Sequence, residues 1–146
     1  MTRPATPADL DSVAYLFNEY RIFYEKPTAL AEGRQFLADR MDRKESVVFV
    51  AETDSGTLAG FVQLYPLFSS TRMKRLWLLN DLFVHADHRG QGHSLALIDA
   101  ARQLCRETKA CGLILETAQT NLIGNRLYPR AGFVLDEEHN YYSWDV

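Results

Sequence analysis

The segment from Asn80 to Arg102 passes from strand-forming residues, through a polar turn with two glycines, into an amphipathic helical pattern. A helix N-terminus carries unpaired amides and a partial positive charge, so a strand that turns directly into a helix offers an anion site. Gly90 and Gly92 would let the backbone approach a pyrophosphate without a Cβ in between, and Arg89 adds a permanent charge. The spacing predicts a phosphate-bearing ligand, and a simple tight turn is the alternative.

Two other phosphate-binding motifs do not fit this turn. A P-loop requires a lysine directly after its second glycine, and no lysine follows Gly92. The dinucleotide fingerprint requires three glycines after an early strand, and only Gly90 and Gly92 match it. The turn therefore calls for a different kind of phosphate site.

The surrounding pattern predicts an α/β chain. Helical spacing of apolar residues predicts two leading helices, over residues 8–25 and 29–42, which precede the sheet. β-Branched and aromatic runs predict an antiparallel hairpin, a third strand, and a later apolar strand that is parallel to the third and buried on both faces. These strands cover residues 46–52, 57–68, 74–85 and 112–118, with a helix over 92–108 and a short one through Asn125 and Tyr128.

Three segments, in order, resemble the GNAT superfamily of acetyl-CoA-dependent N-acetyltransferases. Residues 89–94, RGQGHS, match the pyrophosphate motif R/Q-x-x-G-x-G/A except at Ser94. Upstream, LNDLFV at 79–84 is similar to the central strand of the family. Downstream, residues 116–133 are similar to its N-x-x-A-x-x-L-Y-x-x-x-G-F segment, with Gly124 at the alanine position.

The resemblance implies a GNAT-like fold: a mixed, mostly antiparallel central sheet with helices on both faces. We expect one parallel pair, between the strands that end at His85 and Ala118, with the helix that starts near Gly92 as the crossover. The length of 146 residues fits a single N-acetyltransferase domain over 1–146.

The resemblance also assigns cofactor contacts. The strand at Leu82 to Val84 would hydrogen-bond pantetheine and hold the thioester carbonyl. Amides of this strand near Phe83 or Val84 would stabilise the oxyanion. Asn121 would contact the cofactor, and Tyr128 would face the sulfur and protonate the departing thiolate. The residues implied in binding acetyl-CoA, with CoA as the product, are Leu82, Phe83, Val84, Arg89, Gly90, Gln91, Gly92, His93, Ser94, Asn121 and Tyr128.

Direct attack of an amine on a thioester needs no enzyme nucleophile, but a primary amine with a pKa of about 10.4 must first lose a proton. The resemblance implies that the strand at 79–84 splays from its neighbour and opens a V-shaped slot. Asp81 and Glu116 are the candidate bases, because each is expected on one of the two strands that flank this slot. The alternative for either carboxylate is a structural or surface role.

Aromatic residues on the first helix and on the hairpin could surround the acceptor, although such residues more often form core. Acidic residues there could attract a cation. We expect a small amine, polyamine-like or an amino compound; a protein or peptide lysine or N-terminus, or a noncatalytic CoA-binding module, are the alternatives. The candidate acceptor residues are Tyr20, Tyr24, Tyr65 and Asn80, with Phe23, Phe68, Glu19 and Glu25 around them.

Composition argues against several other classes of protein. A net charge of −3 argues against general nucleic-acid binding, and no stretch approaches the ~20 apolar residues of a membrane span. Cys105 and Cys111 lack metal-ligand spacing with the histidines, so no metal is expected. The start MTRPATPADL has no basic-then-apolar leader, which predicts a cytoplasmic protein. The resemblance also allows a homodimer.

Overall fold

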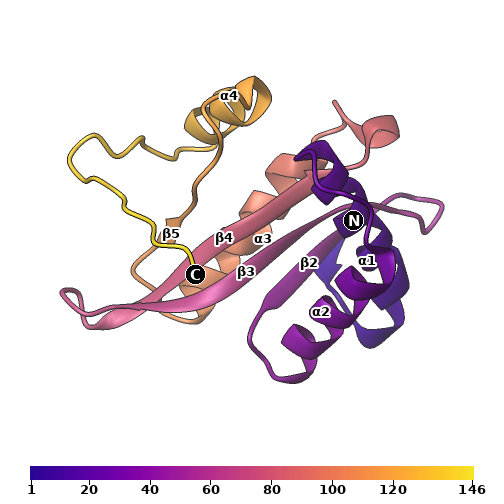
Figure 1. Ribbon diagram of the computed structural model, residues 1–146, viewed down its shortest axis with the longest axis horizontal. Helices are drawn as coiled ribbons and strands as arrows, with labels where there is room; N and C mark the ends of the chain where they lie inside the picture. Colours follow the sequence, from indigo (N-terminus) through magenta and orange to yellow (C-terminus); the bar gives the residue numbers. More distant parts are fainter. The chain divides into compact units, whose positions relative to one another are not determined.

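A five-stranded sheet organises the first 115 residues of the chain (Figure 1). The computed structural model describes all residues 1–146, and they form two units, 1–115 and 116–146. The strand order is β1-β2-β3-β4-β5, antiparallel except for the parallel pair β4–β5. The mixed, mostly antiparallel sheet is thus confirmed. The strands are β1 (Thr2–Pro4), β2 (Val47–Glu52), β3 (Leu58–Ser69), β4 (Lys74–Val84) and β5 (Leu113–Ile114).

Helices cover both faces of this sheet. The first unit contains α1 (Leu10–Phe23), α2 (Leu30–Asp42) and α3 (His93–Glu107), with short 3-10 turns at Pro7–Asp9 and Ala86–His88. In Figure 1, α1 and α2 lie in front of the strands and α3 lies behind them. Thr6 and Asp9 form a capping box around the 3-10 turn that leads into α1, and the Asp9 carboxylate accepts from the Thr6 amide.

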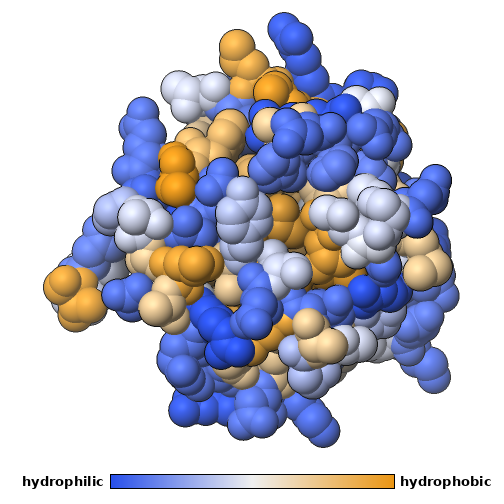
Figure 2. Space-filling view, turned by 90° about the vertical axis from the view of Figure 1, so that its right-hand side faces the viewer, coloured by the Kyte–Doolittle hydropathy of each residue, from blue (hydrophilic) through white to orange (hydrophobic).

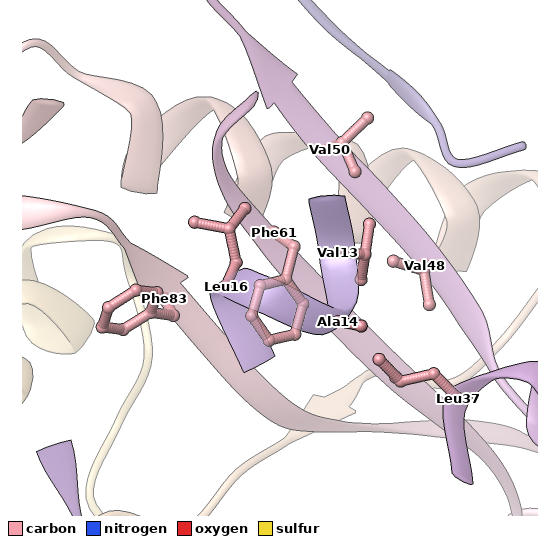
Figure 3. Packing of buried hydrophobic residues seen from close by; sticks show 8 residues of the cluster. All are labelled: Val13, Ala14, Leu16, Leu37, Val48, Val50, Phe61 and Phe83. Carbon is pink, nitrogen blue, oxygen red and sulfur yellow. The ribbon is translucent and has the colours of Figure 1, made fainter. Parts of the chain in front are cut away.

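The core between the sheet and the two leading helices is made of small and medium apolar side chains with two aromatic rings (Figure 3). Alternation along the strands directs every second side chain to this face. Because Phe83 of β4 belongs to this cluster, the end of β4 is fixed by the core. The cluster comprises Val13, Ala14, Leu16, Leu37, Val48, Val50, Phe61 and Phe83.

Two expectations about the strands were wrong. A first strand, β1, precedes the helices and pairs with β2, so the two helices do not precede the whole sheet. Arg3 of β1 forms ion pairs with Asp9 and Glu52. The last strand is two residues long and not buried on both faces, since Ile114 is 42% exposed.

The second unit contains one helix, α4 (Leu122–Arg130), which confirms the short helix expected through Asn125 and Tyr128. The remainder of residues 116–146 forms no other helix and no strand.

One face of the molecule is mostly polar. On the face shown in Figure 2, hydrophilic residues cover most of the area and hydrophobic residues appear as separate patches. None of the helices combines the length and apolar composition needed to cross a bilayer.

Candidate active site

The end of β4 has one free edge. The ladder between β4 and β5 consists of Trp77 with Leu113 and Leu78 with Ile114, and it stops there. Residues 79–84 of β4 continue in register with β3 alone. The backbone groups that face away from β3 over this stretch therefore have no partner strand, as the resemblance implies for a splayed strand.

A β-bulge marks the point where β4 leaves β5. Gln63 of β3 pairs with Asp81, but the next residue, Leu64, pairs with Leu79, so Asn80 is the extra residue on β4. A bulge shifts the alternation by one and re-aims the side chains beyond it. Leu79 therefore lies on the face of the sheet opposite Asp81, and Asp81 lies on the α1 face with Phe83.

Asp81 is a buried acid without a cationic partner. Asp81 is 3% exposed, and no Lys, Arg or His nitrogen lies within ion-pair distance of its carboxylate. Oδ2 accepts a hydrogen bond from Gln63 Nε2 at 2.8 Å and Oδ1 one from Asn80 Nδ2 at 3.2 Å; Tyr20 of α1 also donates to the carboxylate. Burial raises the pKa of Asp81, and these three hydrogen bonds act in the opposite direction.

Three of the predicted acceptor residues belong to this neighbourhood. Tyr20 contacts Asp81 directly, and its ring lies edge-on to the ring of Tyr24, with centroids 5.0 Å apart. Tyr65 is linked through Gln63, whose Nε2 also donates to the Tyr65 hydroxyl at 3.1 Å. Burial, followed by the nearby charge of Asp81, raises the pKa of Tyr65 to about 12.

Other predicted acceptor residues lie elsewhere or at the margin. Asn80 is exposed and contacts Asp81 from the bulge. Phe23 packs edge-on against Tyr24 at 5.2 Å. Phe68 is not part of this cluster, because it is 73% exposed near the end of β3 and its ring lies under the Arg75 guanidinium at 4.7 Å.

Sequence reasoning missed two residues of β3. Gln63 is completely buried, and its Oε1 has no hydrogen-bond partner. Gly60 allows close contact between β3 and β4, since a Cβ there would lie 2.4 Å from the Phe83 carbonyl oxygen and 3.1 Å from Val84 Cα. An amide within the apolar run LAGFVQLYPLF and a glycine inside a strand were the available signals.

The predicted phosphate turn has the geometry of an open cradle. Gly90 and Gly92 have φ angles of 75° and 84°, in the left-handed region that favours glycine. A Cβ at either position would meet nothing within 4 Å. Gly92 is the N-cap of α3, so the first helical amides, including those of His93 and Ser94, have no partner within the helix. These residues fit a pyrophosphate.

Arg89 turns back from the phosphate turn toward β4. Its Nε donates to the Val84 carbonyl oxygen at 3.1 Å, and its guanidinium carbon lies 5.8 Å from the centre of the Phe83 ring and 6.0 Å from that of Phe23. The Val84 carbonyl oxygen at the free edge of β4 is therefore already paired with Arg89.

The second unit carries the remaining predicted residues. Asn121 caps α4: its Oδ1 accepts from the Gly124 amide at 3.0 Å and its Nδ2 donates to Thr117 at 2.9 Å. Tyr128 lies on α4, and a Cβ at Gly124 would lie 2.6 Å from Asn121 Nδ2 and 3.2 Å from the Tyr128 ring. Glycine at this position thus accommodates both side chains. Glu116 is exposed and lies beyond β5, so its expected place on a strand was wrong.

Comparison with known proteins agrees with this architecture. The family model described as Acetyltransferase (GNAT) family matches residues 11–133. A Bacillus subtilis (strain 168) protein named Uncharacterized N-acetyltransferase YhfO is 38% identical over 144 residues, which cover 99% of this chain and 96% of the relative. A Probable acetyltransferase of Haemophilus influenzae (strain ATCC 51907 / DSM 11121 / KW20 / Rd) is 34% identical over 71% of each chain.

A solved structure described as that of a probable acetyltransferase shares the fold over the whole chain. Its TM-score is 0.94, with 38% identity and coverage of 100% of this chain and 97% of that one. Sequence motifs, sheet topology and relatives agree, and the chain belongs to the GNAT family of acetyltransferases.

Proposed function

We propose that this acetyltransferase transfers an acetyl group from acetyl-CoA to the amine of a small molecule, polyamine-like or an amino compound, by direct attack. The observation that carries the proposal is Asp81. Its carboxylate is buried, has no cationic partner, and belongs to the part of β4 that has a free edge. A buried charge without a partner is costly, and an ammonium group of the acceptor would compensate it.

The three tyrosines near Asp81 favour a compact acceptor over a long peptide. Tyr20, Tyr24 and Tyr65 surround one carboxylate through direct contacts or through a single intervening side chain. Such a cluster suits a cation of small size, since aromatic faces and a carboxylate both attract an ammonium group.

Asp81 would take one proton of the ammonium, so that the neutral amine nitrogen forms the new bond to the acetyl carbon as the carbon–sulfur bond breaks. The second proton that the nitrogen then loses balances the one that Tyr128 would give to the departing thiolate. Amides at Phe83 or Val84 would stabilise the oxyanion. Glu116 is proposed only as an alternative base, because it is exposed.

Acetyl-CoA supplies the activated acetyl group when it is bound. The amides of Arg89, Gly90, Gln91, Gly92, His93 and Ser94 would hold its pyrophosphate, and Leu82, Phe83 and Val84 would hold pantetheine. From the second unit, Asn121 is proposed to contact the cofactor and Tyr128 to donate a proton to the thiolate. Residues 1–146 would then act as one catalytic domain.

A thiol-release screen tests this proposal. Acetyl-CoA is offered with polyamines, amino acids, aminoglycosides and basic peptides. We expect turnover with small amines, lost in Asp81→Asn and kept in Asp87→Asn, whose exposed carboxylate lies in the neighbouring turn. Turnover confined to peptides would exclude the small-amine assignment. Binding of acetyl-CoA without transfer to any amine would favour a noncatalytic module.

A further inference from the structure

Gln63 is a completely buried side chain that contacts Asp81 and has no part in the function proposed above. It lies on β3 directly across from Asp81 in the ladder and is completely buried. Its Nε2 makes two hydrogen bonds, to Asp81 Oδ2 at 2.8 Å and to the Tyr65 hydroxyl at 3.1 Å, whereas its Oε1 makes none.

A contribution to stability does not by itself explain a buried Gln63 amide whose Oε1 has no hydrogen bond. A buried polar atom without a hydrogen bond costs free energy, and an apolar side chain of the same shape would avoid that cost. The arrangement does, however, point an N–H group at the carboxylate, and such a group favours the charged form, which can only accept.

We propose that Gln63 is a positioning residue, whose amide holds the Asp81 carboxylate as the hydrogen-bond acceptor that receives the proton of the attacking amine. This inference rests on the proposed function. Gln63 itself does not touch the acceptor; it acts through Asp81.

Few other groups affect the protonation of Asp81. Tyr20 from α1 and Asn80 from the bulge donate to it, and neither bond involves Gln63. Tyr65 of β3 is linked to Asp81 through Gln63, and Tyr24 packs against Tyr20. Arg40 of α2 lowers the pKa of Tyr65 and is itself paired with Glu45. Burial raises the pKa of Asp81, and among the groups that lower it Gln63 has the largest effect.

The test replaces Gln63 with methionine, which has a similar shape and no N–H group. We expect the Asp81 pKa, followed by the ¹³C resonance of its carboxyl carbon, to rise, because the variant loses a hydrogen bond that favours the ionised form. The acidic limb of the kcat/KM profile should move to higher pH by the same amount, because only ionised Asp81 can accept the proton.

Val62→Ala is the matched control. Val62 is the buried neighbour of Gln63 on β3, and its side chain lies on the opposite face of the sheet. This variant should lose stability without moving either titration. If Gln63→Met does not fold, Gln63→Leu replaces it, since leucine also lacks the N–H group that bonds to Asp81.

An unchanged Asp81 titration in the Gln63 variant overturns the proposal. So does a titration that moves while the acidic limb of the rate profile stays in place. The carboxyl titration needs no turnover, so failure of the wild-type protein to acetylate any amine would refute the proposed function while the titration still decides whether Gln63 controls Asp81.

Discussion

Gly60→Ala should damage the fold and the site together, because it forces apart the two strands that carry Asp81 and Gln63. The added Cβ would lie 2.4 Å from the Phe83 carbonyl oxygen, whereas carbon and oxygen atoms normally come no closer than about 3.3 Å. Strand β4 would therefore have to move by roughly 1 Å. The atom that the new Cβ meets most closely is a backbone oxygen, so no side-chain rotation can relieve the contact.

Overpacking of this kind costs typically about 1–3 kcal/mol. For a chain of this size, about 2 kcal/mol corresponds to a Tm lower by roughly 4–8 °C. A 1 Å displacement at Phe83 and Val84 should also reduce turnover, by up to about a hundredfold. Thermal unfolding by circular dichroism measures the first effect and the thiol-release assay the second.

Gly112→Ala is the control, because it makes the same chemical change where a Cβ meets nothing within 4 Å. We expect it to leave Tm and turnover close to wild type. If Gly60→Ala unfolds at the same temperature as Gly112→Ala, the close approach of β3 and β4 does not constrain this site, and the reasoning is refuted.

Gly92→Leu should weaken acetyl-CoA binding, measured by calorimetry, by more than about tenfold, or about 1.4 kcal/mol, since the side chain would fill the phosphate space. Gly56→Leu controls for backbone strain, because φ is also 84° there, and equal losses in both variants would exclude a phosphate site at Gly92. Tyr128→Phe should lower kcat by roughly a hundredfold while acetyl-CoA affinity stays near wild type; unchanged kcat would remove Tyr128 from the mechanism. Asp81→Asn should be more stable than wild type at neutral pH: burial raises the folded-state pKa of Asp81, so the wild-type free energy of unfolding falls as pH rises from 3.8 through that pKa. Urea denaturation across this range would contradict the assignment if the difference between the two proteins did not grow with pH.

Much of the fold could be predicted because its signals are local. The capping residues before α1, the turn between β2 and β3, and the glycines before α3 each specify a boundary through their own conformational preferences. Strand β1 escaped prediction because three residues containing a proline show no periodicity; its pairing with β2 and the ion pairs of Arg3 define it.

The site was harder to predict because its key feature depends on strand pairing. Strict alternation along β4 would place Leu79 and Asp81 on the same face, and only the bulge at Asn80 separates them. Nothing in the local sequence announces that shift. The roles of Gly60 and Gln63 likewise appear only when β3 is set beside β4.

Direct transfer to an amine is tested most directly by initial rates measured while acetyl-CoA and an active amine are both varied. If the amine attacks acetyl-CoA directly, both substrates must be bound together, and double-reciprocal plots should converge. Mass spectrometry of the protein mixed with acetyl-CoA alone should show no acetylated side chain. Parallel lines, together with an acetylated protein, would contradict the account.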